Sequence, residues 1–393
     1  MIATDLSERP QATRPAARIE CLVLTDFRNY AQLRLEPAPR SVVLTGANGA
    51  GKTNLLEAVS FLAPGRGLRR AHLGEVTRRG APAMARWAVA ARLDLPGGTC
   101  DIGTGLESGA AAGERRQVRI DGESARGQAG LGERLGVSWL TPAMDRLFTE
   151  APGGRRRFFD RLVVGLMPGH GRELAAYERG LRERARLLAS GGEGRWLDVV
   201  EETLAAHGVA VAAARRETLG QLQAALAEAS DPFPRPSLAI VGEIEGWLDD
   251  MAAVDAEHRF AGLLRDSRLR DAESGHSIHG PHRSNLSAHH LAHDMPAGEC
   301  STGEQKALLV SIILAEARLR VARSGAPPLL LLDEVAAHLD ANRRAALAEA
   351  LIGLGAQAWL TGTDAELFEH LGGQATFYTV ADDSVSTREY PSA

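Results

Sequence analysis

The chain has few cysteines and no long apolar run. Its three cysteines, Cys21, Cys100 and Cys300, are scattered and form no CxxC pair, which argues against a disulfide framework and a cysteine zinc site. No apolar run approaches the roughly eighteen residues of a membrane span. The N-terminal residues 1–17 are polar and contain prolines, without the apolar core of a signal peptide. We therefore expect a cytoplasmic protein that makes no membrane contact.

Lysine is almost absent, because Lys52 and Lys306 are the only lysines in the chain. Such a chain keeps lysine where a compact ammonium is needed and a planar guanidinium would not fit. The remaining composition is that of a globular protein: 393 residues, 44% of them hydrophobic and 24% charged, enough for a sizeable core and two lobes. The net charge of −5 indicates no particular partner. It does not exclude nucleic acid, because local basic patches decide that.

One of the two lysines lies in a P-loop pattern, Gly-x-x-x-x-Gly-Lys-Thr, at residues 46–53. The apolar residues 41–44 before it predict a short buried strand, and apolar residues at helical spacing follow it. Strand, glycine loop and helix together predict a phosphate cradle, in which Lys52 meets the β- and γ-phosphates and the Thr53 hydroxyl ligates Mg²⁺. A glycine-rich turn before an ordinary helix accounts less well for this spacing. The predicted nucleotide-binding residues here are Gly46, Ala47, Asn48, Gly49, Ala50, Gly51, Lys52, Thr53 and Asn54.

A second buried strand ends in two carboxylates. Residues 327–334 run from two prolines through four leucines to Asp333 and Glu334, a pattern typical of a parallel strand that is covered on both faces. Open α/β sheets bind ligands at the carboxyl ends of their strands. We therefore expect Asp333 to hold Mg²⁺ together with Thr53. Glu334 is the predicted general base, which makes Glu334 and Lys52 the candidate catalytic residues.

The segment 299–306 lies ahead of an apolar helix. Ser301 and Glu304 fit a capping box, which is the simplest explanation of this pattern. The capping box does not explain Gly303 in the first turn, where glycine costs about 1 kcal/mol relative to alanine. The segment resembles the signature of ABC-type ATPases, which binds the γ-phosphate held by a second subunit. This interpretation predicts an ATP-dependent dimer whose residues acting on the partner's nucleotide are Ser301, Gly303, Gln305 and Asp340.

Two further segments carry polar side chains of one type. Arg66, Arg69 and Arg70 lie on a glycine-bearing loop that either contacts DNA phosphates or is a solvated loop, and the sequence favours neither. Several histidines lie between His276 and His293. We consider metal binding there the weaker interpretation, because an expected strand would place His276 and His279 on opposite faces and no cysteine accompanies them.

The remaining pattern predicts an α/β protein. Antiparallel strands are expected at 18–24, 32–35, 86–94 and 116–120, with a loose hairpin between the last two. Two antiparallel helices are expected at 171–190 and 197–229, followed by a strand at 237–244 and a helix at 251–268. We assign residues 1–139 to the N-terminal part of an ATPase lobe, 140–235 to a helical arm lobe, and 236–393 to the C-terminal part of the ATPase lobe.

Taken together, these motifs resemble the ABC-ATPase head of the SMC-like proteins, a parallel P-loop sheet with an antiparallel side sheet and a helical arm. Within that group the chain resembles the RecF family of bacterial DNA replication and repair ATPases. The segments that carry the resemblance are 26–30, 46–54, 64–67, 155–160, 280–283, 301–305, 331–340 and 361–363.

The resemblance implies that ATP and Mg²⁺ are bound, with Arg28 and Asn29 also contacting the nucleotide. It implies a homodimer that clamps DNA at single-strand gaps, works with RecO and RecR to load RecA, and is a weak ATPase that DNA stimulates. The chain departs from the family pattern where Ser284 and Asn285 replace acidic residues and where His338 precedes the D-loop leucine. Thr361 or Thr363, and no histidine, occupies the switch position, which is in keeping with the family and predicts slow hydrolysis.

Two alternatives belong to other functional classes. The first is the ATPase subunit of an ABC transporter, although the P-loop and Asp333 are too far apart for that compact module. The second is a nucleotide-gated DNA clamp without productive hydrolysis, against which Glu334 argues, because a protein that only binds nucleotide needs no base there.

Overall fold

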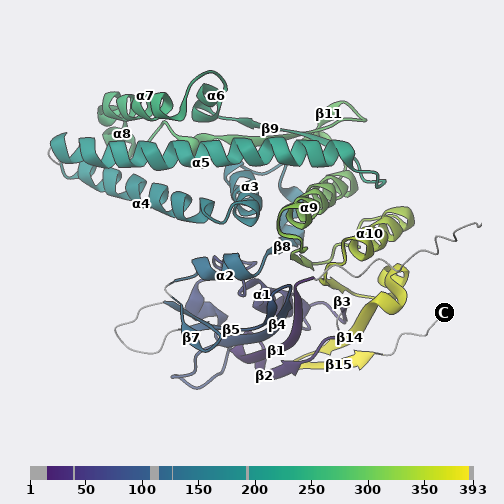
Figure 1. Ribbon diagram of the computed structural model, residues 1–393. Helices are drawn as coiled ribbons and strands as arrows, with labels where there is room; N and C mark the ends of the chain where they lie inside the picture. The colour runs from purple at the N-terminus through teal and green to yellow at the C-terminus, as the bar shows by residue number, and fades with distance from the viewer. Residues whose placement is uncertain (1–15, 39, 107–114, 126, 192–193, 389–393) are drawn as a thin grey trace, which may run out of the picture.

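The computed structural model describes residues 16–388, except 39, 107–114, 126 and 192–193. Two sheets form an ATPase lobe, and a group of long helices forms a second lobe above it in Figure 1. Residues 1–15, part of the segment without a signal-peptide core, lie outside the described residues. Within the described part, no helix is both long and apolar enough to span a bilayer.

The central sheet has the strand order β15-β14-β3-β13-β12-β8. Its strands are parallel except for β15, which pairs antiparallel with β14. Every residue of β3, β12 and β13 is buried, as the apolar runs predict. Because the strands are parallel, the ends of β3 and β12 meet at one edge of the sheet. The strands are β3 (Ser41–Thr45), β8 (Val137–Leu140), β12 (Leu329–Leu332), β13 (Ala358–Gly362), β14 (Ala375–Ala381) and β15 (Ser384–Arg388).

An antiparallel side sheet flanks the central one, in the order β2-β1-β4-β5-β6-β7. The expected side sheet is confirmed, but the loose hairpin is wrong, because residues 98–106 form a strand paired with β4 along its length. Its glycines weaken the strand signal, although alternate residues such as Cys100 and Ile102 are buried. The strands are β1 (Arg18–Phe27), β2 (Tyr30–Leu35), β4 (Ala88–Leu95), β5 (Gly98–Leu106), β6 (Arg116–Ile120) and β7 (Glu123–Ser124).

The two long helices of the second lobe, α4 (His170–Ala189) and α5 (Gly194–Glu228), confirm the predicted antiparallel pair. The lobe boundary at 235 is wrong, because α6 and α7 pack on α5, and α8 packs on α4, in the same lobe (Figure 1). Tyr177, Trp247 and Phe260 share one core there. The remaining helices of the lobe are α3 (Pro152–Leu166), α6 (Glu243–Asp250), α7 (Ala253–Asp266) and α8 (Arg268–Ser274).

Buried ion pairs hold this lobe together. Arg184 is fully buried and donates to Glu201 at 2.8 Å and to Asp271 at 2.6 Å, and also to Ser277 and the Leu264 carbonyl. A second arginine, Arg215, donates to both carboxylate oxygens of Asp160, at 2.8 and 2.9 Å. Each of these guanidinium groups therefore meets its opposite charge inside the lobe.

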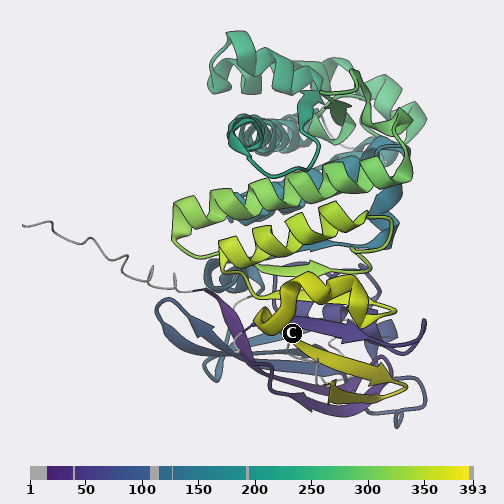
Figure 2. The same cartoon turned by 90° about the vertical axis from the view of Figure 1, so that its right-hand side faces the viewer.

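Helices α9 (Thr302–Ser324) and α10 (Ala341–Leu354) lie between the helical lobe and the central sheet, adjacent to each other (Figure 2). A small third sheet joins β9 (Pro236–Val241), β10 (Asn285–His290) and β11 (Met295–Pro296). The expected strand near 237–244 and helix near 251–268 are thus confirmed as β9 and α7. The shorter helical segments are α1 (Lys52–Ser60), α2 (Ala129–Arg134), and the 3₁₀ turns Leu73–Val76, Pro142–Arg146, Pro281–Arg283, Ala297–Glu299 and Ala365–Gln374.

Candidate nucleotide site

The P-loop connects β3 to α1 through residues that only glycine suits. Gly46 has φ +146°, and a Cβ there would lie 2.2 Å from the carbonyl oxygen of Val380. Gly51 has φ +106°, and a Cβ there would lie 2.6 Å from Nδ2 of Asn29. Side chains at these positions would meet both backbone strain and a steric clash. The loop thus has the tight, backbone-lined form that binds phosphates at a helix N-terminus.

Lys52 begins α1, and its ammonium group folds onto the loop. Its Nζ donates to the carbonyl oxygens of Gly46 at 2.7 Å and Ala47 at 2.8 Å. The residue is only 4% exposed and forms no ion pair within the described part of the chain. Burial lowers the pKa of Lys52, while Glu334 and Asp333 act in the opposite direction. A buried cation held only by neutral carbonyls is a place where an anion is favoured.

The two carboxylates after β12 are organised by a third residue, Thr361. The Oδ1 atom of Asp333 accepts hydrogen bonds from the hydroxyls of Thr53 at 3.0 Å and Thr361 at 2.7 Å. The same Thr361 hydroxyl accepts from the backbone N–H of Glu334 at 2.8 Å. Thr361 is fully buried at the end of β13. It is therefore a positioning residue for the Asp333 carboxylate and for the backbone of Glu334, whereas Thr363 is exposed and bonds to Asp364.

Glu334 has a strained backbone with φ +49°, in the left-handed region that non-glycine residues rarely adopt. The second lysine holds it there, because Nζ of Lys306 donates to the Glu334 carbonyl at 2.8 Å. Lys306 also lies 3.4 Å from Asp145. Both lysines of the chain thus lie at the same edge of the sheet, one for the loop and one for the strand end. The sequence analysis noted Lys306 as one of two lysines but predicted no function for it, whereas the structure shows that it holds the backbone of Glu334.

Magnesium fits the oxygen atoms at this edge. The Thr53 hydroxyl and the Asp333 carboxylate are hard donors whose oxygens already lie 3.0 Å apart. Mg²⁺ prefers such oxygens, with water completing its shell.

Arg28 and Asn29 lie beside the P-loop in different ways. Asn29 is next to it, since its side-chain oxygen accepts from Asn54 at 2.7 Å. Arg28 instead makes a bidentate pair with the buried Glu57, at 2.7 and 2.8 Å, and donates to the Glu75 carbonyl at 2.9 Å. Its guanidinium therefore supports α1 in this structure, and its expected contact with the nucleotide remains a proposal.

Of the residues expected to act on the partner's nucleotide, Ser301 and Asp340 are exposed to solvent, whereas Gln305 is buried. Ser301 is exposed and caps α9 through a complete capping box with Glu304, as predicted. Asp340 is also exposed and caps α10 by accepting from the N–H of Arg343 at 2.8 Å. Gln305 differs from the expectation, because it is 5% exposed and donates to the Cys300 carbonyl at 2.8 Å. It therefore shapes the loop and does not face a partner here.

A steric contact within the same chain also favours glycine at position 303. A Cβ there would lie 3.2 Å from the carbonyl oxygen of His338, which is tighter than an ordinary contact. His338 itself has φ +67°. The residues before Asp340 therefore already favour glycine here, in addition to the expected approach of a phosphate.

The three arginines expected to contact DNA lie in two different environments. Arg66 and Arg70 line a cavity of about 1060 Å³ between the P-loop lobe and α3 and α4, together with Arg157. Burial lowers the pKa of Arg70, and the neighbouring Arg157 adds to this effect. Carboxylates also line the cavity, among them Glu150 and Glu178. Arg69 does not line it, and pairs instead with Asn54 at 2.6 Å and Glu57 at 3.1 Å.

The Gly-Pro-His-Arg segment packs inside the helical lobe. Nδ1 of His282 accepts from the Tyr177 hydroxyl at 2.7 Å, and its Nε2–H donates to the Ser277 carbonyl at 2.9 Å. Ser284 donates to Glu245 at 2.7 Å, and Asn285 accepts from Arg155 at 2.9 Å. Ser284 and Asn285 therefore each have a hydrogen-bond partner inside the protein.

The histidines of the segment 276–293 do not share one strand. His276 and His279 lie in the loop after α8, so the expected strand there is wrong. His289 and His290 end β10 instead.

Comparison with known proteins gives the family. The model of the RecF/RecN/SMC N-terminal domain matches residues 18–386. The chain is 50% identical over 374 residues to the DNA replication and repair protein RecF of Mesorhizobium japonicum, covering 94% of this chain and 98% of that one. It is also 50% identical over 367 residues to that of Rhizobium etli strain CIAT 652, covering 93% and 97%. The chain belongs to the RecF family.

Solved structures agree on the fold. The recombination mediator protein RecF-ATPrS in the RecFOR pathway superposes with a TM-score of 0.80 at 19% identity, over 96% of this chain and 100% of that one. The SMC head bound to the C-winged helix domain of ScpA superposes with a TM-score of 0.54 at 14% identity, over 94% and 96%. The predicted ABC-ATPase head with a helical arm is therefore confirmed, which argues against the transporter subunit.

Proposed function

We propose that this RecF-family protein is an ATP-driven dimer that clamps DNA in replication and recombinational repair and is released by slow, DNA-stimulated ATP hydrolysis. One observation carries the proposal. The P-loop and Asp333 form one half of a nucleotide site, whereas Ser301 caps an exposed helix N-terminus and has no hydrogen bond to the P-loop among the described residues. A second copy of the chain would bring its Ser301 to this chain's nucleotide.

The chemistry follows from the groups at the sheet edge. Lys52 would leave its carbonyl partners to neutralise the β- and γ-phosphates of ATP, a stronger interaction for a buried ammonium. Mg²⁺ held by Thr53 and Asp333 would supply further neutralising charge. Glu334, fixed through Thr361 and Lys306, would accept a proton from the attacking water.

Arg66 and Arg70 support DNA binding, because they add positive charge to the wall of a large cavity between the lobes. Arg69 offers a matched comparison on the same loop, since its guanidinium is already paired. The logarithm of DNA affinity falls as the logarithm of salt concentration rises. Replacing Arg66 and Arg70 together by serine should make this slope shallower by about 2, whereas Arg69→Ser should leave it unchanged. Equal slopes in the wild type and both variants would show that these arginines do not contact DNA phosphates.

The direct test is retention on a gapped DNA duplex at one fixed salt concentration, with ATP, with ADP and without nucleotide. We expect retention only with ATP, prolonged by Glu334→Gln and abolished by Lys52→Ala. Absence of DNA binding in every state would contradict the proposal. Retention that Glu334→Gln does not prolong would instead favour a clamp without productive hydrolysis. By resemblance to the family, RecO and RecR are the proposed partners in loading RecA at such gaps.

A further inference from the structure

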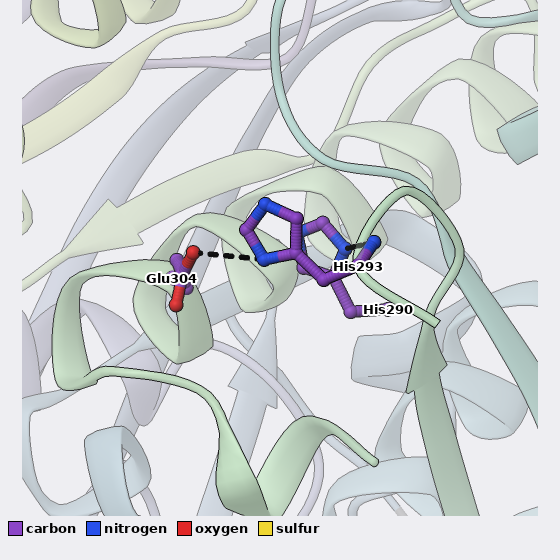
Figure 3. A group of neighbouring side chains, drawn as sticks. All are labelled: His290, His293 and Glu304. Atoms are coloured by element: carbon purple, nitrogen blue, oxygen red, sulfur yellow. Dashed lines mark hydrogen bonds and ion pairs between the residues drawn. The ribbon is translucent and has the colours of Figure 1, made fainter. Parts of the chain in front are cut away.

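Beside the signature lies a group of side chains that the proposed function does not use. His290 ends β10, His293 lies in the turn before β11, and Glu304 lies in the first turn of α9. Their side chains converge, as Figure 3 shows, and one ligand atom from each lies within 4.8 Å of the others. The imidazole rings of His290 and His293 stack with centroids 4.1 Å apart, and Nδ1 of His293 lies 3.1 Å from Oε1 of Glu304.

Metal binding would replace a hydrogen bond that the two histidines now share. Nδ1 of His290 accepts from the backbone N–H of His293 at 3.2 Å, so the ring hydrogen lies on Nε2. A metal ion would take the place of this hydrogen bond at Nδ1, or would bind Nε2 after the ring hydrogen moves to Nδ1. His290 is 3% exposed. His293 is half exposed, which gives an ion a path from solvent.

We infer that His290, His293 and Glu304 bind a divalent transition-metal ion of the zinc class. Imidazole and carboxylate ligands suit such ions, and three protein ligands with one open position are an established zinc arrangement. Ligand atoms around tetrahedral zinc lie about 3.4 Å apart, so a rotation of the exposed His293 ring would complete the set. The histidine pattern alone favoured metal binding only weakly, and it did not include Glu304, which lies on the following helix α9.

The carboxylate of Glu304 couples this site to the signature. Its Oε2 accepts from both the N–H and the hydroxyl of Ser301, each at 2.9 Å, while its Oε1 faces His293. A cation on Oε1 would draw charge from Oε2 and weaken its hold on the Ser301 hydroxyl. It would also place positive charge beside a helix N-terminus that meets a phosphate. Zinc should therefore favour ATP-driven dimerisation, a consequence that rests on the proposed function, whereas the metal site does not.

The experiment is a titration of the full-length, chelator-treated protein without nucleotide, using Zn²⁺ in calorimetry and Co²⁺ in absorption spectroscopy. We expect one ion per chain with the spectrum of a four-coordinate site. His293→Gln should weaken binding by at least about tenfold, the lower end of what loss of even an outer-shell partner costs a metal site. His293 is exposed, so this substitution should leave the fold intact.

The matched control is His289→Gln, on the neighbouring residue, whose ring pairs with Asp294 at 2.9 Å and is not part of the cluster. It should bind zinc like the wild type. Equal affinities in both variants, or no binding at micromolar zinc, would overturn the site. Dimerisation with ATP and Mg²⁺ is then measured with and without zinc. Failure to dimerise in either case contradicts the proposed function, whereas dimerisation that zinc leaves unchanged contradicts only the coupling to Ser301.

Discussion

The helical lobe and the nucleotide site treat buried charge in opposite ways. In the helical lobe, Arg184 and Arg215 each meet carboxylates at hydrogen-bond distance, and these contacts are complete within the chain. At the nucleotide site, Lys52 is nearly as buried but is held by two carbonyls, and Asp333 is held by two hydroxyls. The first arrangement stabilises a fold. The second keeps charge in place for a ligand that brings the opposite sign.

Removing a buried charge should therefore have different consequences in the two regions. In the helical lobe it should lower stability, and at the nucleotide site it should weaken ligand binding. Removing a paired charge leaves its partner buried and uncompensated, which destabilises the fold. Removing a charge reserved for a ligand relieves its desolvation, so the folded protein should lose binding and little stability.

The largest effect is expected from Arg184→Ala. It leaves Glu201 and Asp271 buried without their shared partner, and should lower the free energy of unfolding by about 3–5 kcal/mol. Denaturant unfolding measures this, and Arg186→Ala on the exposed face of the same helix is the control. A loss below 1 kcal/mol would show that the lobe does not depend on these pairs.

Lys52→Ala should act on binding alone. ATP affinity should fall at least about 100-fold, or about 2.7 kcal/mol, because the phosphates lose their buried counter-charge. The melting temperature without nucleotide should stay at or above that of the wild type. The measurement is ATP titration beside thermal unfolding. Normal ATP binding by Lys52→Ala, or a loss of stability as large as that of Arg184→Ala, would show that the charge of Lys52 is not reserved for a ligand.

His282 makes the helical lobe sensitive to pH. Burial lowers its pKa from 6.5 to about 4 in the folded protein, so between these values the unfolded chain binds more protons than the folded one. Stability should be complete above pH 6.5 and fall as the pH drops toward 4, by an amount on the order of 2 kcal/mol. His282→Gln should flatten unfolding free energy across this window. An unchanged pH profile in the variant would assign the dependence to other groups.

The smallest effect concerns Thr361→Val, which keeps the shape of the side chain but removes the hydroxyl shared by Asp333 and Glu334. We expect ATP to bind with nearly normal affinity and hydrolysis to slow about tenfold, equivalent to about 1.4 kcal/mol. Thr361→Ser, which retains the hydroxyl, should restore most of the rate. Equal rates in the valine and serine variants would remove Thr361 from the positioning of Glu334.

The sequence predicted the parts whose signal is local. The P-loop, the leucine strand before Asp333, the capping box at Ser301 and the long helices α4 and α5 all follow from contiguous patterns. It did not predict contacts between distant segments. These include the Thr361 bridge, the Arg28–Glu57 pair and the packing of α6 and α7 on α5. Strand β5 was missed because glycine weakens local propensity, and its pairing with β4 overrides that weakness.

The central claim is that one chain supplies the P-loop and a second supplies the signature. It is tested by mixing two inactive variants, Lys52→Ala, which has an intact signature but cannot hold ATP, and Ser301→Arg, which holds ATP but has a blocked signature. We predict that each alone lacks ATP-driven dimerisation and hydrolysis, that Ser301→Arg still binds ATP as a monomer, and that the mixture regains ATP hydrolysis. A mixture as inactive as its components, with ATP still bound by Ser301→Arg, would contradict the composite site.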